Sequence, residues 1–545
     1  MSRVEARLRA APWWALALLA STASLCMGLA TPPSGPAWLV WLGWIPLVLV
    51  LRVSTHRSAR SLFALGLVGG LCTGLVGFPW IAETLVRFGD FPVPLAWFGL
   101  VVFATWTAVP FGAWAIGVAK GPQRGWAAYV WPMALWVCVN DLWPALFPYT
   151  PMIGLAQQAE WIQAAEIGGV PLVEAQTIAV GILVADAILD RDRRWLRVGI
   201  AIAIPLLSFL LGSWRIATID AEAAQARVVR FGVLQPNTAL FAERRGDKMM
   251  RLWTHSALAQ REGAQVIVWP EAGIYPWVVE RPWTHDFRGP RQVLAAHRLP
   301  TILGVATRAQ GDPYEWNSVV IMNADGEVTG SFDKTVLVPF GEYVPIVDPA
   351  WAKSYVPAMS HNYAGEDPAR FEVDLVGEGE TFHAGPLICY EDIFPGFARD
   401  VAVQDGGIEV FVNVTIDTWF GDTAEPWEHL ALAQFRSVEH RIPMVRSVAA
   451  GTSSVVDTAG RVAAALPVRA PTREQSVEAE RLVVDVALPR NTAESPTIFS
   501  SVGWLLQWLC IAIGLLVPVI AFVRRRWLSR TPARPPVYSD EPSDR

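Results

Sequence analysis

Six stretches of this chain contain no charged residue, and they constrain its fold more than any other feature. They span residues 10–51, 61–82, 91–119, 125–140, 198–214 and 495–523. A helix needs about 20 consecutive apolar residues to cross the roughly 30 Å hydrocarbon core of a bilayer. Charged residues make up only 17% of the chain, whereas a soluble domain carries about 25%. The sequence therefore predicts an integral membrane protein.

Two details of these stretches set the expected number of membrane spans. Prolines and a glycine at 32–36 divide the first stretch into two helices, and a further apolar run at 167–185 is interrupted only by Glu174. We therefore expect about eight transmembrane helices in a polytopic α-helical protein. Their ranges are 12–31, 36–53, 61–80, 95–118, 126–147, 169–189, 197–213 and 501–523.

Basic residues gather at alternate ends of these predicted helices. They precede the first helix (Arg3, Arg7 and Arg9) and follow the second, fourth, sixth and eighth, where Arg524, Arg525 and Arg526 stand. Cytoplasmic loops carry the excess of Arg and Lys in membrane proteins. The pattern predicts that both termini are cytoplasmic and that residues 215–498 face outward, into the periplasm of a Gram-negative cell, from the inner membrane.

The charge distribution predicts four parts of the chain. Residues 1–214 form a membrane domain of seven helices, 215–498 a periplasmic domain, 499–530 the eighth helix with its basic flank, and 531–545 a disordered cytoplasmic tail. A net charge of −6 gives no sign of a nucleic-acid partner. The eight His have no zinc-site spacing, so neither a metal nor a cofactor is expected.

The outer segment alternates short β-branched runs with helical stretches, which is typical of an α/β domain. Nearly continuous apolar runs indicate strands that are buried on both faces. Helices are expected near 243–262, 287–298 and 424–440. Strands are expected at Val228–Leu234, Val266–Trp269, Thr301–Thr307, Ser318–Asn323, Pro386–Tyr390, Glu409–Val414, Val445–Asp457 and Arg481–Ala487.

Cys389 is the one Cys of the five that lies outside the predicted membrane helices. A lone thiol in an oxidising compartment is either a buried, inert side chain or one retained for its reactivity. Here an apolar strand ends abruptly at Cys389 and is followed by acids, which is where an exposed nucleophile would sit. The position therefore favours a reactive thiol.

Two other segments supply groups that suit a nucleophilic Cys. Val266–Trp269 is an apolar strand followed by Glu271, and a third segment carries Lys334 and Glu342. Only four of the 44 basic residues are Lys, and an ammonium with a tunable pKa is something that Arg does not offer. A thiolate could attack a carbonyl, a carboxylate could take its proton, and an ammonium could stabilise the oxyanion. Singly, each residue also fits a turn, a solvated charge or a helix cap.

These residues together resemble the nitrilase superfamily, in which a Glu-Lys-Cys triad lies on an α-β-β-α sandwich. Predicted spans on both sides of the domain narrow the resemblance to the apolipoprotein N-acyltransferase family. The motifs that carry it in the outer segment are Trp269-Pro-Glu271, Leu337–Pro345, Ile388–Asp392, Trp419–Asp422 and His429-Leu430. Those in the membrane part are Leu29–Pro33, Gly77–Ile81 and Ile167–Val170.

The resemblance implies a two-step acyl transfer, the last step of bacterial lipoprotein maturation. Cys389 would take an acyl chain from a phospholipid, typically phosphatidylethanolamine, and pass it to the α-amine of an S-diacylglyceryl cysteine on an apolipoprotein. By motif position, Glu271 is the proton acceptor and Lys334 the oxyanion partner. We expect a membrane-embedded monomer without a cofactor. Supporting residues are Glu342, Tyr390 and Glu391, and substrate contacts are expected from Trp419, Phe420, Trp351 and Tyr355, the last two within a lid or packed loop at 344–363.

Three positions depart from the family pattern. Val336 stands where members have His, and Ile416 and Ala449 stand where they have Asn. We interpret the chain as a divergent member with an altered acceptor pocket. Two alternatives remain open: a membrane-anchored acyltransferase or amidohydrolase with a different acceptor, and a non-catalytic paralogue that binds lipid or lipoprotein.

Overall fold

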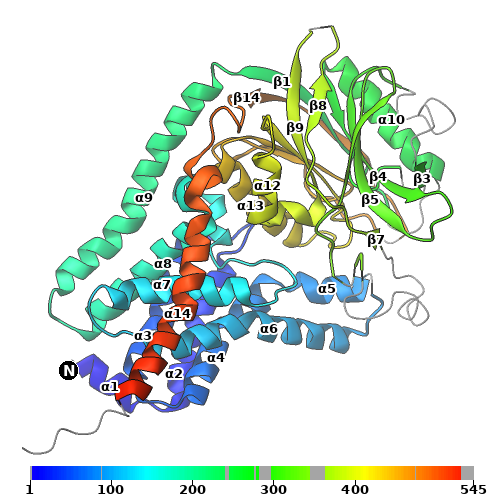
Figure 1. Cartoon of the computed structure of the whole chain (residues 1–545). Coiled ribbons are helices and arrows are strands. Elements are labelled where there is room, and N and C mark those ends of the chain that lie inside the picture. The colour runs from blue at the N-terminus through cyan, green and yellow to red at the C-terminus, as the bar shows by residue number, and fades with distance from the viewer. Residues whose placement is uncertain are drawn as a thin grey trace, which may run out of the picture.

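The chain folds into a bundle of apolar helices with an α/β domain on one end (Figure 1). This computed structural model describes residues 3–87, 89–239, 245–274, 278–281, 296–339, 341–343, 362–377, 379–472 and 474–528. The helices of the bundle are α1 (Arg3–Ala10), α2 (Trp13–Leu29), α3 (Val40–Val53), α4 (Ala59–Gly77), α5 (Trp80–Arg87), α6 (Val93–Lys120), α7 (Ala127–Leu142), α8 (Ala165–Leu189), α9 (Arg194–Ala223) and α14 (Leu505–Leu528).

Within the described part of the chain, five helices are long and apolar enough to cross a membrane. A sixth span results if α1 and α2, which meet at an angle of 112°, are counted as one. The multi-pass helical domain is as predicted, but eight long spans are not found: α3 has 14 residues and α7 has 16. Pro36 precedes the short helical turn that leads into α3, and Trp143, in extended conformation before Pro144, ends α7 well before the predicted residue 147.

The bundle is held together by aromatic packing around Trp44, a fully buried side chain of α3. Its ring lies 4.8 Å from that of Trp136 and 5.0 Å from that of Trp114, between ring centroids. Its indole N–H donates to Thr177 Oγ1 at 3.1 Å, and Trp136 donates likewise to the buried Glu174. Glu174, the one acid in the apolar run at 167–185, therefore has a hydrogen-bond partner, as a polar group in a membrane interior must have.

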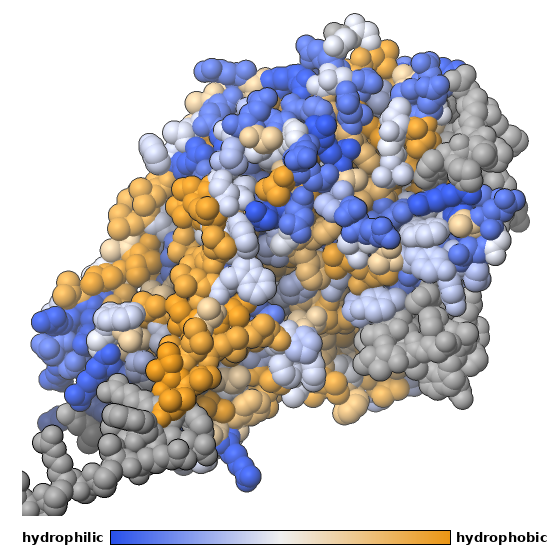
Figure 2. Space-filling view, viewed as in Figure 1, coloured by the Kyte–Doolittle hydropathy of each residue, from blue (hydrophilic) through white to orange (hydrophobic). Residues whose placement is uncertain are grey.

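Two helices present apolar side chains outward along their length. On α9 these include Trp195, Leu206, Leu210 and Trp214, and on α14 they include Trp508, Leu516 and Ile520. Figure 2 shows them as a hydrophobic belt below the hydrophilic α/β domain. Large exposed apolar surfaces of this extent mark contact with a membrane or a partner, and here they coincide with membrane-length helices.

The α/β domain contains two sheets, one of eight strands and one of six among the described residues. The strands of the first are β1 (Arg227–Gln235), β2 (Val266–Val268), β3 (Val278–Arg281), β4 (Thr301–Ala309), β5 (Glu315–Met322), β6 (Val328–Asp333), β7 (Asn362–Tyr363) and β14 (Glu480–Leu488). Those of the second are β8 (Phe371–Asp374), β9 (Thr381–Ile388), β10 (Val410–Thr415), β11 (Met444–Val448), β12 (Ser454–Val456) and β13 (Val462–Ala465).

The two sheets pack face to face and are covered by helices outside. One apolar core joins residues such as Phe231 of β1 to Phe382 of β9. Helix α10 (Arg245–Arg261) packs on the outer face of the first sheet, and α12 (Pro395–Ala402) and α13 (Glu425–His440) pack on that of the second. The predicted α-β-β-α order is therefore present, with α12 and α13 turned toward the membrane helices (Figure 1).

All predicted strands are present with shifted bounds, two of them differ most from the prediction, and one predicted helix lies largely outside the described residues. Val445–Asp457 is not one strand but the hairpin of β11 and β12, because the chain reverses at Gly451, whose φ of 151° falls in a region that L side chains rarely adopt. The strand expected at Pro386–Tyr390 ends earlier, at Ile388. The helix expected at 287–298 falls mostly among residues 282–295, outside those described.

Candidate active site

A cavity of about 660 Å³ lies where the α/β domain meets the membrane helices. Its lining includes Cys389, Glu271 and Lys334, together with Trp80 and Phe147 from the membrane domain. The three strand-end residues that the sequence analysis singled out therefore share one cavity with the bundle.

Cys389 is the first residue of a short helical turn, Cys389–Ile393, that directly follows β9. Its backbone has φ of +50°, an uncommon conformation for a residue with a side chain. The amide of Asn413 on the parallel neighbour β10 donates to the Cys389 carbonyl at 3.1 Å and so fastens the turn. Backbone strain of this kind, over-determined by its surroundings, is typical of functional positions.

Glu391 holds the Cys389 turn against the loop that carries Lys334. Its fully buried carboxylate accepts hydrogen bonds from the backbone N–H of Ile388 at 2.8 Å, of Thr335 at 2.7 Å and of Val336 at 3.1 Å. Burial raises the pKa of Glu391 to about 8, against the opposing effect of these donors. Glu391 does not line the cavity, so its place is that of a positioning residue.

Glu271 lies shortly after β2, where the chain passes close to the interior of β4. Gly304 of β4 packs against it: a Cβ on Gly304 would lie 2.5 Å from the Glu271 Cα, so only glycine fits there. The following residue, Ala272, has φ of +51°, and its carbonyl accepts from Lys248 Nζ at 2.6 Å. The Glu271 side chain is buried and accepts from Asn317 Nδ2 at 2.6 Å.

Lys334 is buried between two carboxylates, with 1% of its surface exposed. Its Nζ lies 2.9 Å from Glu342 Oε1 and 3.9 Å from Glu271 Oε1, and Asn317 donates to both carboxylates. This set, Glu271, Asn317, Lys334 and Glu342, is called the Lys334 cluster below. The alternative that Lys334 is a solvated surface charge, which the sequence also allowed, is therefore wrong.

Burial and mutual charge set the protonation of this cluster. Burial by itself would lower the Lys334 pKa, but Glu342 and Glu271 outweigh it, so the pKa is raised and the ammonium stays charged. Burial raises the pKa of Glu271, against the pull of Lys334. Burial also raises the pKa of the Cys389 thiol, and Glu271 adds to it while Lys334 opposes. The resting thiol is thus protonated and needs a base beside it.

Aromatic side chains of the membrane domain close the opposite side of the cavity. Trp80 of α5 packs edge-on against Phe147 and against Phe420 of the α/β domain, at 6.0 and 5.2 Å between ring centroids. Tyr390, next to the thiol, packs against Phe147 and donates its hydroxyl to the Leu146 carbonyl. The walls therefore suit an apolar chain that enters from the bilayer.

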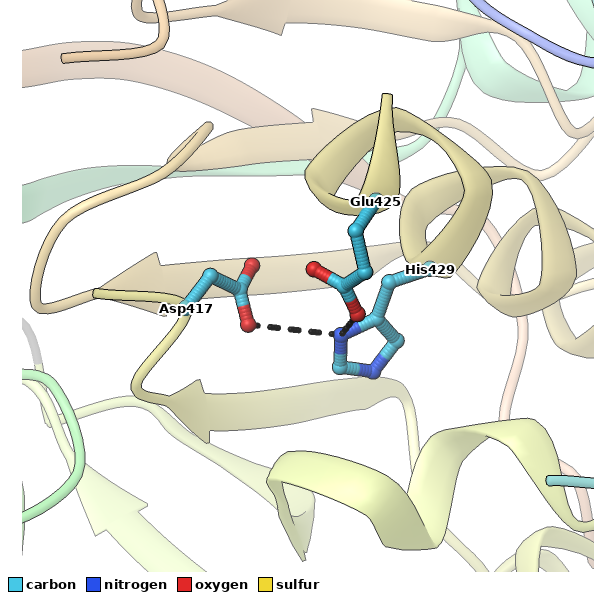
Figure 3. Close-up of side chains that lie close together, drawn as sticks. All are labelled: Asp417, Glu425 and His429. Carbon is cyan, nitrogen blue, oxygen red and sulfur yellow. Dashed lines mark ion pairs between the residues drawn. The ribbon is translucent and has the colours of Figure 1, made fainter. Parts of the chain in front are cut away.

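A second buried ionic group lies at the start of α13 (Figure 3). His429 Nε2 lies 2.8 Å from Asp392 Oδ1, and His429 Nδ1 lies 3.4 Å from Asp417 Oδ1 and 4.0 Å from Glu425 Oε1. Asp392, Asp417, Glu425 and His429 are called the His429 cluster below. Although burial alone would lower it, the His429 pKa is raised to about 10, chiefly by Asp392, so the ring is an imidazolium.

Three residues of the His429 cluster could also surround a metal ion. One ligand atom each from Asp417, Glu425 and His429 lie within 4.8 Å of one another, and Asp392 would hold the second ring nitrogen as metal-bound histidines require. The sequence did not suggest this set, because the three residues lie on a loop and a helix without a metal-site spacing. The imidazolium already supplies the cationic charge at the same point.

Comparisons with known proteins agree with this geometry. Residues 23–183 match the model of the apolipoprotein N-acyltransferase N-terminal domain, and residues 230–491 match that of carbon-nitrogen hydrolases. The chain is 28% identical to an apolipoprotein N-acyltransferase of Brucella melitensis, over 97% of this chain and 100% of that protein. It is 29% identical to one of Allorhizobium ampelinum, over 93% and 97%. The chain belongs to the apolipoprotein N-acyltransferase family.

Solved structures of nitrilase-superfamily proteins match part of the chain at low sequence identity. Saccharomyces cerevisiae Nit3, a member of branch 10 of the nitrilase superfamily, matches at 16% identity with a TM-score of 0.36, over 48% of this chain and 92% of its own. An amidase from Nesterenkonia sp. AN1 matches at 17% identity with a TM-score of 0.34, over 55% and 97%.

Some of the remaining predicted site residues line the cavity, and others lie outside the described residues. Trp419, Phe420, Glu342 and Tyr390 line the cavity, as expected of residues near a substrate. Trp351, Tyr355 and most of the expected lid at 344–363 lie outside the described residues.

Of the three positions that depart from the apolipoprotein N-acyltransferase pattern, Ile416 alone lines the cavity. Val336 donates its backbone N–H to Glu391, and Ala449 is buried and exchanges backbone hydrogen bonds with Thr415 and Asn237.

Sequence reasoning missed several residues of this site. Asn317 lies mid-strand in β5, and Glu425 and Glu428 begin an amphipathic helix, so nothing local marks them as cavity residues. Their one sequence signal is an acidic first turn in α13 next to the Trp419–Asp422 motif.

Proposed function

We propose that this enzyme moves a fatty acyl chain from a phospholipid to the α-amine of an S-diacylglyceryl cysteine at the N-terminus of an apolipoprotein. One observation carries the proposal: Cys389, Glu271 and Lys334 open into a cavity whose other wall is aromatic and belongs to membrane helices. A hydrolase of small soluble amides has no use for such a wall, whereas both lipid substrates must come from the bilayer.

In the first half of the reaction Cys389 takes the acyl group. Glu271 accepts the Sγ proton, the thiolate attacks the ester carbonyl of the phospholipid, and Lys334 Nζ stabilises the developing oxyanion. The C–O bond breaks, the proton passes from Glu271 to the departing lysophospholipid, and an acyl-thioester remains. The aromatic wall excludes water, which would otherwise hydrolyse the thioester.

In the second half the acceptor amine attacks the same carbonyl carbon. A C–N bond forms, the C–S bond breaks, and the thiol is restored. Glu342 and Asn317 keep Lys334 and Glu271 in place through both halves, because Asn317 bridges the two carboxylates. Phosphatidylethanolamine is the expected donor.

We infer the orientation of the chain from the same architecture. The N-terminus and the end of α14 lie together, at the end of the bundle away from the α/β domain (Figure 1). Basic residues such as Arg7 and Arg194 stand at that end, which supports cytoplasmic termini and a periplasmic catalytic domain in the inner membrane. We further propose that the shorter helices α3 and α7 also cross the membrane, which brings the crossings to eight, and we expect a monomer.

The test is the intact mass of the full-length protein in detergent after incubation with phosphatidylethanolamine. Wild type should gain one fatty acyl group that hydroxylamine removes, and Cys389→Ala should gain none. Release of the acyl group to water alone, with a diacylglyceryl peptide present, would instead identify a hydrolase. Absence of any adduct on folded wild type would overturn the proposal and favour a binding role.

A further inference from the structure

Glu425 is a buried carboxylate with no hydrogen bond to explain its place. Its residue surface is 8% exposed, and Oε2 has no hydrogen-bond partner within the described part of the chain. The nearest cationic atom is His429 Nδ1 at 4.0 Å, which Asp417 approaches more closely at 3.4 Å. Burying a carboxylate without a hydrogen-bond or ion-pair partner lowers the folding stability by several kcal/mol. Its side chain lines the cavity.

Glu428, one turn further along α13, repeats the pattern. It is 3% exposed; Oε2 accepts from the indole N–H of Trp80 at 3.0 Å, and Oε1 has no hydrogen-bond partner among the described residues. Positions three apart on a helix lie on the same face, and both glutamates line the same cavity. Trp80 belongs to the membrane domain, so this pair of acids faces the junction from which lipids enter.

Helix capping does not account for the two acids. Acidic residues in a first turn often cap the free N–H groups of a helix or oppose its dipole. Neither carboxylate accepts a hydrogen bond from the backbone of α13 among those the structure shows, and Ala424, the N-cap residue, makes no side-chain bond. Each glutamate instead keeps an oxygen free in a largely apolar cavity.

We propose that Glu425 and Glu428 form a binding site for the primary ammonium group of a lipid-borne substrate. A cation at this point gives both free carboxylate oxygens the partner that they lack. The inference rests on the proposed function, in which two molecules carry such a group: the acceptor, through its α-amine, and phosphatidylethanolamine, through its headgroup.

The charges around the pair leave room for one added cation. Arg446 pairs with Asp392, and His429 lies closer to Asp392 and Asp417 than to Glu425, so among the described residues neither cation is hydrogen-bonded to Glu425 or Glu428. Burial, with Asp417 adding to it, raises the Glu425 pKa, and burial raises the Glu428 pKa. A cation that binds beside the two acids favours their charged forms.

For the acceptor amine the site also offers the first proton-transfer step. Glu425 takes one proton from the bound ammonium, and the free amine attacks the thioester carbonyl to form the C–N bond. The second N–H proton passes to Glu271 and from there to Sγ as the C–S bond breaks. Products are the amide, the restored thiol and a protonated Glu425, which returns its proton to solvent.

The experiment measures the two half-reactions separately in full-length protein. Acylation of Cys389 is followed by intact mass with phosphatidylethanolamine and, in parallel, with phosphatidylglycerol, which has no amine. The isolated acyl-enzyme is then mixed with a diacylglyceryl cysteine peptide, and loss of the adduct is timed. Variants are Glu425→Gln, Glu428→Gln and Glu425→Asp, with Glu372→Gln, an exposed residue of β8, as the matched control.

We expect Glu425→Gln to slow transfer to the peptide by about 10²-fold, the lower range of a lost general base. Glu425→Asp should recover part of the rate, and acylation by phosphatidylglycerol should be unchanged. Slower acylation by phosphatidylethanolamine alone would place the headgroup in the site and equally support the ammonium assignment.

Wild-type rates in every arm for both Gln variants would overturn this inference and leave the proposed function intact. Equal slowing with both donors would also overturn it, because the acids would then serve the thiol and not an amine. A wild-type enzyme that forms no adduct would remove the proposed function itself.

Discussion

Two buried ionic groups face the same cavity and differ in how completely they are paired. In the Lys334 cluster the ammonium bonds to Glu342, and Asn317 donates to both carboxylates, although Glu271 Oε2 has no hydrogen-bond partner among the described residues. In the His429 cluster the imidazolium lies beside three acids, Arg446 pairs with one of them, Asp392, and Glu425 Oε2 has no hydrogen-bond partner within the described part of the chain. The first group is organised before substrate arrives, as electrostatic catalysis requires. In our proposal the second is completed by a ligand.

The two clusters also lie in different parts of the fold. In the Lys334 cluster, Glu271 follows β2, Lys334 follows β6, Asn317 lies within β5 and Glu342 lies in the loop after β6, in a sandwich with a continuous core. The His429 cluster stands on the turn after β9, the loop after β10 and the first two turns of α13, where the α/β domain touches the membrane helices. In our proposal the sandwich holds the reacting groups, while the domain junction receives the substrate.

Of the variants considered, those that remove the Lys334 charge should lower stability and acylation the most. Lys334→Met leaves two buried carboxylates without their cation, which costs about 3–5 kcal/mol of stability, and should lower acylation by at least about 10³-fold. Lys334→Arg keeps the charge and should retain more stability, but a planar fork cannot occupy the place of an ammonium, so acylation stays low. Chemical unfolding and adduct formation measure the two losses. Near-wild-type acylation by Lys334→Arg would mean that charge alone suffices.

Neutralising Glu271 should separate catalysis from stability. Glu271→Gln keeps the size of the side chain and removes the proton acceptor, so acylation of Cys389 should slow by about 10²–10⁴-fold with little change in unfolding. Adduct formation over time by intact mass measures it, beside Glu372→Gln. Unaltered acylation would assign the proton transfer to another group.

The His429 cluster should make the free energy of unfolding depend on pH. Because the His429 pKa is raised to about 10 from 6.5, its stabilising effect is complete below pH 6.5 and is lost as pH rises toward 10. The free energy of unfolding should fall over that window by up to about 5 kcal/mol. His429→Gln should flatten this slope, whereas His56→Gln, an exposed loop variant, should keep it. An identical slope in both variants would contradict the imidazolium.

The smallest effect is expected from the packing that places Glu271. Gly304→Ala puts a Cβ 2.5 Å from the Glu271 Cα, and over-packing of this kind costs about 1–3 kcal/mol. Acylation should fall by about tenfold because Glu271 moves away from the thiol. Gly396→Ala, where no atom lies within 4 Å of the added Cβ, is the control. Equal rates for the two variants would show that the close approach is not needed.

Much of the molecule follows from local patterns in the sequence. Charge-free runs locate apolar helices because a membrane helix must be apolar along its whole length. The strand at Val228–Leu234 is recognisable because an apolar run indicates a buried strand. Cys389 and Glu271 stand out because each follows such a run, and Lys334 stands out because Lys is rare in this chain. The number of spans was less predictable, since a proline-containing turn precedes α3 and another follows α7, and both helices have fewer than about 20 residues.

Only the tertiary structure decides what surrounds the thiol. Asn317 joins two carboxylates from distant segments, and Trp80 of the membrane domain bonds to Glu428 of α13, 348 residues later. Neither relation leaves a periodic signal, because a contact between remote segments depends on how sheets and helices pack and not on neighbouring residue types. The sequence by itself indicated the candidate reactive groups and their membrane setting. The fold decided which acids remain unpaired in the cavity, since pairing depends on distances that only packing sets.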